Sequence, residues 1–240
     1  MAAIPNQLLA ALPRKAYSAL LPGLSPVTLQ FGDVLYEPKQ RITHVYFPGS
    51  SMVSLLTLVD DHLALEVGLV GHEGMVGAQL ALGMGSSPVR ALVQGGGSAM
   101  RMTAGRFRSA LQRSPTLLRG LLRYVHMLMS QITQTAACNR FHVVEARLAR
   151  WLLMTRDRMG SDEFRMTQEF LSNMLGVRRV GVTEAAGALQ RKKLIEYNRG
   201  VIHILDDRGL EAACCTCYRA QLDQNGGQSL GQSPKSTATA

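Results

Sequence analysis

The sequence predicts an α+β chain, with an N-terminal antiparallel β-roll of jelly-roll type, a long connecting dimerisation helix and a C-terminal winged helix-turn-helix. Short apolar runs separated by turns occupy the first half, an apolar stripe at helical spacing begins at Pro115, and residues 166–205 divide into two short helical patterns and a hairpin. The predicted domains are residues 1–114, 115–138 and 139–218, and the Gly, Ser, Gln and Pro content of residues 219–240 predicts a disordered tail.

The first domain is predicted to consist of short strands. Apolar residues alternate in residues 27–31 and again in residues 63–69, as expected of half-buried strands. Further strands are expected at residues 45–47, 52–58, 89–93 and 99–102, with turns at residues 32–33, 48–49 and 60–62. Such spacing favours an antiparallel sandwich or barrel.

The stripe after Pro115 predicts one long helix, which is either a core helix or a coiled-coil seam. Its apolar residues are Leu118, Leu121, Leu122, Val125, Leu128, Met129 and Ile132. Asn139-Arg140 is the expected hinge before a second helix at residues 143–159. The arginines of this second helix are expected on a solvated face, namely Arg147, Arg150, Arg156 and Arg158.

Residues 166–191 predict a helix-turn-helix. Thr167 suits an N-cap, and Gly176 suits the end of the first helix. The second helix begins at Arg178-Arg179, and its predicted buried face comprises Val182, Ala185, Ala186 and Leu189. A basic helix start after a Gly-containing turn suits insertion into the major groove of DNA.

The residues of the second helix have side chains that suit base edges. An arginine matches the two acceptors of guanine, Glu184 can accept from cytosine N4, and Val180 can contact a thymine methyl. Residues 194–205 predict a hairpin with a basic tip at Arg199, and residues 176–199 hold six Lys/Arg against two acids. The candidate DNA-binding residues are Thr167, Gln168, Arg178, Arg179, Val180, Thr183, Glu184, Arg191 and Arg199.

Residues 167–211 resemble the winged helix-turn-helix of the Crp/Fnr family of bacterial transcription regulators. In its best-known members an Arg, a Glu and a further Arg on the second helix read bases. Arg179 stands at the first of these positions, Val180 at the second and Glu184 at the third, which implies DNA binding at a different target. The resemblance also implies a two-fold dimer through residues 116–137, with RNA polymerase as a candidate partner.

Residues 70–93 resemble, more loosely, the cyclic-nucleotide-binding β-roll of the same family. There, a Gly-Glu pair binds the ribose hydroxyl, and an Arg followed by Ser or Thr binds the cyclic phosphate. Gly77 and Arg90 are the corresponding ligand-binding candidates, but Ala78 and Ala91 follow them, so we do not expect a cyclic nucleotide. Glu73 is an untested substitute acceptor.

Other chemistry has little support. The four cysteines, Cys138, Cys214, Cys215 and Cys217, give no disulfide framework and lack the usual four-ligand spacing, so we expect no metal. Relatives with an iron–sulfur cluster use cysteines near the N-terminus, and this chain has none before Cys138, so no such cluster is expected.

Composition agrees with a non-enzymatic cytoplasmic protein. The sequence has no P-loop, G-x-S-x-G or H-E-x-x-H motif, no apolar run long enough to span a membrane and no signal-peptide pattern. The net charge of +9 fits a polyanionic partner such as double-stranded DNA. The alternative is a signalling or interaction module with a degenerate sensor domain and only non-specific DNA binding.

Overall fold

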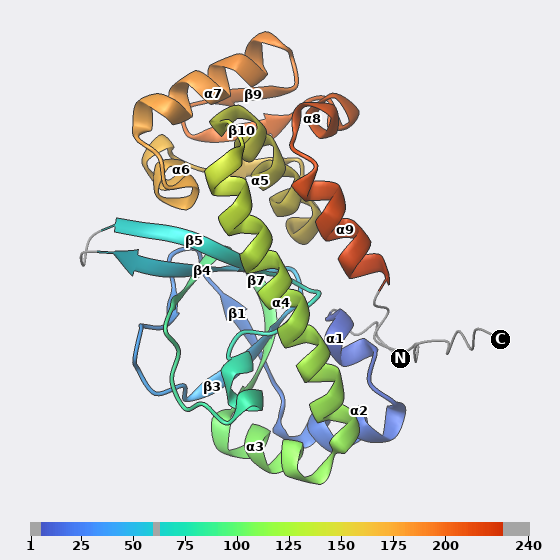
Figure 1. Ribbon diagram of the computed structural model, residues 1–240. Coiled ribbons are helices and arrows are strands. Elements are labelled where there is room, and N and C mark those ends of the chain that lie inside the picture. The colour runs from blue at the N-terminus through green and yellow to red at the C-terminus, as the bar shows by residue number, and fades with distance from the viewer. Residues whose placement is uncertain (1–5, 60–62, 228–240) are drawn as a thin grey trace, which may run out of the picture.

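The computed structural model describes residues 6–59 and 63–227 (Figure 1). The N-terminal domain contains α1 (Gln7–Ala10), α2 (Arg14–Leu20), η1 (Leu21–Gly23), β1 (Ser25–Leu29), β2 (Val34–Tyr36), β3 (His44–Pro48), β4 (Met52–Val59), β5 (Leu63–Val70), η2 (Ala78–Leu82), β6 (Arg90–Gly95), β7 (Gly97–Thr103) and α3 (Ala104–Arg113). It is followed by α4 (Pro115–Phe141), α5 (Val144–Met159), β8 (Glu163–Arg165), α6 (Gln168–Leu175), α7 (Arg179–Arg191), β9 (Ile195–Asn198), β10 (Val201–Ile204), α8 (Asp207–Ala213) and α9 (Cys217–Gly227). We call residues 144–227, from α5 to α9, the C-terminal domain.

The N-terminal domain is the predicted antiparallel β-roll. Its strands form two sheets, in the orders β1-β7-β3 and β2-β6-β4-β5, and each neighbouring pair is antiparallel. The predicted strands are all present, whereas β2, α1, α2 and α3 were not predicted. The expected turn at residues 60–62 lies outside the described residues.

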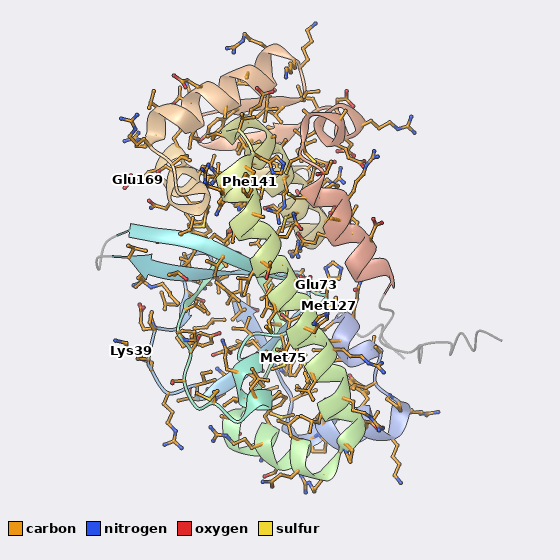
Figure 2. The ribbon with its side chains drawn as sticks, viewed as in Figure 1. Lys39, Glu73, Met75, Met127, Phe141 and Glu169 are labelled. Carbon is orange, nitrogen blue, oxygen red and sulfur yellow. The ribbon has the colours of Figure 1, made fainter. Side chains whose placement is uncertain are left out.

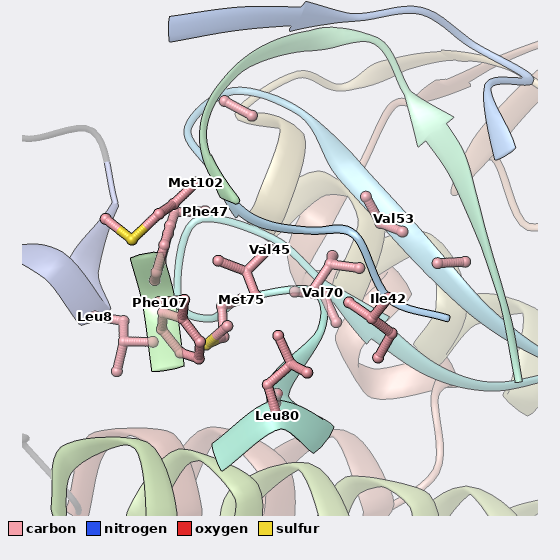
Figure 3. Packing of buried hydrophobic residues seen from close by; sticks show 14 of the residues in the cluster. Leu8, Ile42, Val45, Phe47, Val53, Val70, Met75, Leu80, Met102 and Phe107 are labelled. Atoms are coloured by element: carbon pink, nitrogen blue, oxygen red, sulfur yellow. The ribbon is translucent and has the colours of Figure 1, made fainter. Parts of the chain in front are cut away.

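The core of the β-roll lies between the two sheets. Phe47 of one sheet and Val53 of the other belong to one fully buried apolar cluster, to which Phe107 of α3 and Leu121 of α4 also contribute (Figure 3). Apolar side chains from both sheets therefore hold the roll together, and α4 completes its core.

β4 explains why residues 52–58 are almost continuously apolar. Alternate side chains of a strand point to opposite faces, so Val53 and Leu55 enter the β-roll core, while Met52 and Leu56 point away from it. The C-terminal domain covers this outer face, where Leu152 of α5 belongs to the same buried cluster as Met52 and Leu56. The strand is buried on both faces because the two domains share a sheet.

The strict alternation expected in β5 is interrupted. The pairing with β4 shifts register between Gly68 and Glu66, which leaves Val67 as an extra residue. Val67 consequently packs against the β-roll core and Leu69 joins the interdomain cluster. The alternating pattern of a half-buried strand would place Glu66 on the solvent side, but Glu66 is buried in the structure.

Glu66 is the polar centre of the domain contact. Its Oε1 accepts a hydrogen bond of 2.9 Å from Trp151 Nε1 of α5, and its Oε2 accepts one of 2.7 Å from Ser54 Oγ of β4. Burial raises the pKa of Glu66 from 4.5 to about 7, although these two hydrogen bonds favour the charged form. A second interdomain link joins Arg158 of α5 to Glu73, with 2.9 Å between Nε and Oε1.

α4 runs along the β-roll toward the C-terminal domain, as the ribbon view shows (Figure 1). The Tyr124 hydroxyl donates to the Met75 carbonyl at 3.1 Å, and Gln131 Oε1 accepts from the Leu69 amide at 3.0 Å. The long helix was predicted, but it continues beyond the expected hinge at Asn139-Arg140 and ends at Phe141.

Two expectations for the C-terminal domain are wrong. Arg147, Arg150 and Arg158 are buried instead of solvated, because α5 is the central helix of this domain and packs on several sides. The predicted disorder from residue 219 is also wrong as far as Gly227, since α9 spans Cys217–Gly227. None of the helices described in the structure is long and apolar enough to cross a membrane.

The pKa of Glu66 predicts a pH-dependent stability. Because this pKa is raised on folding, the native state binds more protons than the unfolded state between pH 4.5 and about 7. The free energy of unfolding should therefore fall by up to about 3 kcal/mol as pH rises through this interval. Glu66→Gln keeps a neutral partner for Trp151 and Ser54, so it should stabilise the protein above pH 7 and make little difference near pH 4.5.

Urea unfolding of both proteins across this pH range measures the effect. Glu196→Gln is the matched control, because Glu196 is an exposed carboxyl group on β9. Parallel pH profiles for wild type and Glu66→Gln would contradict the buried-carboxyl account.

Candidate nucleic-acid interface

The helix-turn-helix begins with the predicted cap. Thr167 Oγ1 accepts from the Phe170 amide at 3.1 Å, which satisfies a free donor in the first turn of α6. Gly176 ends α6 with a φ of 60°, and a Cβ at this position would lie 2.6 Å from Leu65 Cδ1 of β5. The left-handed backbone favours glycine at this position, and the side chain of Leu65 in the β-roll approaches it closely.

α7 buries the face that the sequence predicts to be buried, and its opposite face is exposed. Val182, Ala185, Ala186 and Leu189 are buried. Val180 is 53% exposed, and Glu184 and Arg191 are also exposed. The exposed face is therefore free to enter a groove of DNA.

Arg178 and Arg179 lie at the start of α7, as predicted. Arg178 is the N-cap, Arg179 is the first helical residue, and both are exposed. Within the described part of the chain, neither guanidinium group has a hydrogen bond or an ion pair. Their donors are thus available to acceptors outside the chain.

Gln168 and Thr183 join the two helices of the motif. The Thr183 hydroxyl lies 3.1 Å from Gln168 Oε1 and 3.0 Å from the Arg179 carbonyl oxygen, to either of which it can donate. These two predicted site residues therefore also link α6 to α7.

The hairpin beyond α7 is the predicted wing, with one strand more than expected. β10 pairs with β9 and with β8, and Val201 lies opposite Asn198. The turn consists of Arg199 and Gly200, whose φ values of 47° and 78° are typical of a two-residue type I′ hairpin. The Tyr197 hydroxyl donates to the Met166 carbonyl at 2.8 Å, which places the basic tip beside the start of α6.

Not every basic side chain of this region is free. Lys192 Nζ pairs with Glu145 Oε1 of α5 at 2.5 Å, so its charge is partly compensated. Arg191 Nη1 lies 3.4 Å from where a Cβ on Gly187 would be, which shows that the arginine folds back over this glycine. The other basic residues between Gly176 and Arg199 are all exposed, namely Arg178, Arg179, Arg191, Lys193 and Arg199.

The two nucleotide candidates of the β-roll have local structural roles. Gly77 has a φ of 92°, and Arg90 Nε pairs with Glu37 Oε2 at 2.8 Å. Ala78 and Ala91, which stand where the Glu and the hydroxyl residue are expected, are buried in the apolar core. Glu73, the substitute acceptor, is already paired with Arg158.

The predicted dimer stripe divides into two groups. Leu121 is fully buried in the core of its own chain, so its assignment to a dimer interface is wrong. Val125 and Leu128 pack partly against the same core. Leu122 and Met129 are 43% and 61% exposed, and Leu118 and Ile132 are half-buried. An apolar strip of α4 therefore remains on the surface of the single chain.

The comparison with known families identifies the C-terminal domain. Residues 146–213 match the family model described as the Crp-like helix-turn-helix domain. The chain carries a Crp-like helix-turn-helix. This match covers α5, the two helices of the motif, the wing and α8, and it confirms the predicted resemblance to the Crp/Fnr family. No curated protein matches the sequence.

Solved structures extend the likeness to most of the chain. A regulator assigned to the Crp/Fnr family from Eubacterium rectale has a TM-score of 0.68 at 19% identity, over 88% of this chain and 97% of its own. The c-di-GMP-responsive global regulator CLP of Xanthomonas campestris has a TM-score of 0.66 at 16% identity, over 81% and 100%. FixK2 of Bradyrhizobium japonicum has a TM-score of 0.68 at 13% identity, over 80% and 98%. At these identities the likeness establishes a Crp/Fnr fold, in which a β-roll precedes the Crp-like helix-turn-helix.

Sequence reasoning missed one group of side chains of metal-ligating type. Cys138, His142, Cys215 and Cys217 bring their ligand atoms within 4.8 Å of one another. The four residues form two sequence pairs that lie far apart, and the expectation of no metal treated the C-terminal cysteines as a group without partners. The i, i+4 spacing of Cys138 and His142 was the available signal, because such residues share one face of a helix.

We expect cyclic AMP to leave the melting temperature of the protein unchanged, because Arg90 is already paired with Glu37 and the residue that follows it, Ala91, is apolar. A ligand at about 100 times its Kd stabilises the native state by about 2.7 kcal/mol, so binding would be visible. Thermal unfolding with cyclic AMP, and with 5′-AMP at equal concentration as control, tests this. A saturable rise with cyclic AMP alone that disappears in Arg90→Ala would contradict the prediction.

Proposed function

We propose that this protein is a non-enzymatic, sequence-specific transcription regulator that binds a two-fold symmetric DNA site as a dimer. The observation that carries the proposal is that Arg178 and Arg179, at the start of α7, have guanidinium groups with no partner among the residues that the structure describes. They stand in a Crp-like helix-turn-helix, and the Crp/Fnr fold of the chain supports the same class of function. RNA polymerase remains a candidate partner.

Base reading is assigned to the exposed face of α7. Arg179 is positioned to donate two hydrogen bonds to guanine O6 and N7, the commonest specific contact. Glu184, one turn further along the helix, accepts from the amino group of cytosine, and Val180 contacts a thymine methyl. Because Val180 and Glu184 replace the charged residues of the best-known members, we expect a different operator.

Phosphate binding is assigned to groups around α7. Arg178 precedes the helix, Arg199 forms the tip of the wing, and Thr167 and Gln168 begin α6. Such groups fix the position of a protein on the duplex without selecting a sequence. They also make binding depend strongly on salt, because each neutralised phosphate releases counterions.

The dimer is assigned to the exposed strip of α4. Leu118, Leu122, Met129 and Ile132 lie along the face of α4 that the β-roll does not cover. Burying this strip against its symmetry copy removes apolar surface from water. A parallel pair of α4 helices also sets the two copies of α7 about one DNA turn apart, as a two-fold operator requires.

The main prediction concerns the arginine pair. Arg178→Ala/Arg179→Ala should weaken binding to the selected site by at least about 100-fold, since one well-placed arginine contributes about 1–3 kcal/mol of discrimination and a dimer loses two pairs. Selection from random duplexes at physiological salt defines the site, and fluorescence anisotropy measures its Kd. Low salt is avoided because phosphate contacts alone then give binding.

Arg14→Ala/Lys15→Ala is the matched control. These two residues are also consecutive, basic and exposed at the start of a helix, but α2 lies at the far end of the molecule from α7 (Figure 1). The control should bind like wild type. If wild type selects no sequence, the regulator proposal fails, and a signalling module with only non-specific DNA binding is the better account.

The dimer is tested with a single charge. Leu122→Glu should shift the chain from dimer to monomer at micromolar concentration in light scattering, because an unpaired carboxylate is costly in an apolar interface. Leu21→Glu is the control, because Leu21 is exposed to the same degree, 44% against 43%, but lies in η1. A monomeric wild type with intact specific DNA binding would refute the dimer assignment.

A further inference from the structure

Four metal-ligating side chains meet where α4 ends. Cys138 lies in the last turn of α4 and His142 is its C-cap, while Cys215 and Cys217 flank the start of α9. Among the described residues this is the group of Cys, His, Asp and Glu side chains whose ligand atoms all lie within 4.8 Å of one another. The three cysteines are buried and His142 is half-buried.

The distances suit a single ion with four ligands. Cys138 Sγ lies 3.5 Å from Cys215 Sγ, and Cys217 Sγ lies 3.5 Å from His142 Nδ1. In a tetrahedral zinc site the ligand atoms are separated by about 3.5–3.8 Å, given the usual Zn–S and Zn–N bond lengths. Small rotations of the side chains therefore suffice to place the four ligand atoms around one centre.

The groups around the cluster suit an anionic site. Gln134 Nε2 lies 2.9 Å from Cys217 Sγ and can donate to it. Arg150 is buried, it donates to Gln221 Oε1 at 3.1 Å, and it lines the same small cavity as Cys138. Arg150 Nε and the Nε of the neighbouring Arg147 are buried without a hydrogen bond to any residue that the structure describes. Buried cations of this kind are compensated when nearby thiols become thiolates.

We propose that Cys138, His142, Cys215 and Cys217 bind one zinc ion in a structural Cys₃His site. Three thiolates and one imidazole around Zn²⁺ give a net charge of −1, which the buried Arg150 offsets. Binding releases the thiol protons to solvent, and the imidazole binds in its neutral form. All four positions are filled by protein ligands, as in structural sites and unlike catalytic ones.

Zinc fits this cluster better than an iron–sulfur centre. A cluster of several irons and sulfides separates its protein ligands by its own width, whereas these four ligand atoms converge on one point. A Cys₃His set with tetrahedral spacing is a common structural zinc site. Cys214 is not a ligand, because its Sγ lies 3.1 Å from the Cys215 carbonyl oxygen, to which it donates.

The site joins the end of the long helix to α9. Cys138 and His142 belong to α4 and its cap, and α4 also packs against α9 and contacts it through the hydrogen bond from Gln134 to Cys217. Phe141, between the two ligands, marks this end of α4 in Figure 2. Zinc therefore fixes the connection between the proposed dimer helix and the C-terminal domain.

Metal analysis of the full chain tests the proposal directly. Protein purified without chelator should contain about one zinc per chain by plasma mass spectrometry, with no iron and no acid-labile sulfide. Cys138→Ser and Cys217→Ser should each reduce zinc to a small fraction of this content. Cys214→Ser, which changes the neighbouring thiol, should retain all of it.

Two readouts keep the test independent of whether the variants fold well. Cobalt(II) added to metal-free wild-type protein should give the visible d–d bands of a tetrahedral ion and a thiolate-to-cobalt charge-transfer band in the near ultraviolet. A strong chelator should lower the melting temperature of wild type and Cys214→Ser, and it should have no effect on Cys138→Ser.

Several results would overturn the assignment. Stoichiometric iron with sulfide would show a cluster instead, and a Cys138–Cys215 disulfide in freshly isolated protein would show a redox pair. Absence of zinc together with octahedral cobalt spectra would show that the four side chains do not bind an ion. Since none of these measurements uses DNA, the zinc proposal and the proposed function can fail separately.

Discussion

The arrangement of the whole chain depends on the outer face of the four-stranded sheet. Met52 and Leu56 of β4 form one buried cluster with Leu152 of α5, so the sheet serves the core of the β-roll on one side and that of the C-terminal domain on the other. Within this apolar contact, the hydrogen bond from Trp151 to Glu66 is directional and fixes how α5 lies on the sheet. The position of α7 follows, because α7 packs on α5 through Val182 and Leu189.

Local sequence signals predicted the C-terminal domain well because its structure is determined locally. The cap at Thr167, the left-handed glycine at Gly176 and the alternation of buried and exposed residues in α7 are each decided within a few residues. The wing was recognisable for the same reason, since Arg199-Gly200 must adopt positive φ values in a two-residue turn. β8 was missed because three residues give no reliable period.

Features that depend on distant contacts could not be predicted. Periodicity placed Leu121 on the same stripe as Leu122, but only the packed β-roll decides that Leu121 is buried within its own chain and Leu122 is not. The arginines of α5 looked solvated because charge suggests exposure, whereas Arg158 and Arg150 have partners 85 and 71 residues away. The group of four ligands around Cys138 and His142 was not predicted because Cys215 follows Cys138 by 77 residues, beyond the helix-turn-helix in the sequence.

A signal from the β-roll reaches α7 through the attachments that hold the C-terminal domain. Among the described residues, these include the shared sheet with Glu66, the Arg158–Glu73 pair, the approach of Leu65 to Gly176, and the end of α4 where Cys138 and His142 meet the cysteines before α9. An effector changes DNA binding only if it has different affinities for two arrangements of these attachments. The β-roll offers no polar pair at Ala78 and Ala91 for a cyclic nucleotide, whereas protonation of Glu66 and binding of the proposed zinc ion would each act on an attachment itself. Control of the proposed regulator is therefore to be sought at the domain contacts before the interior of the β-roll.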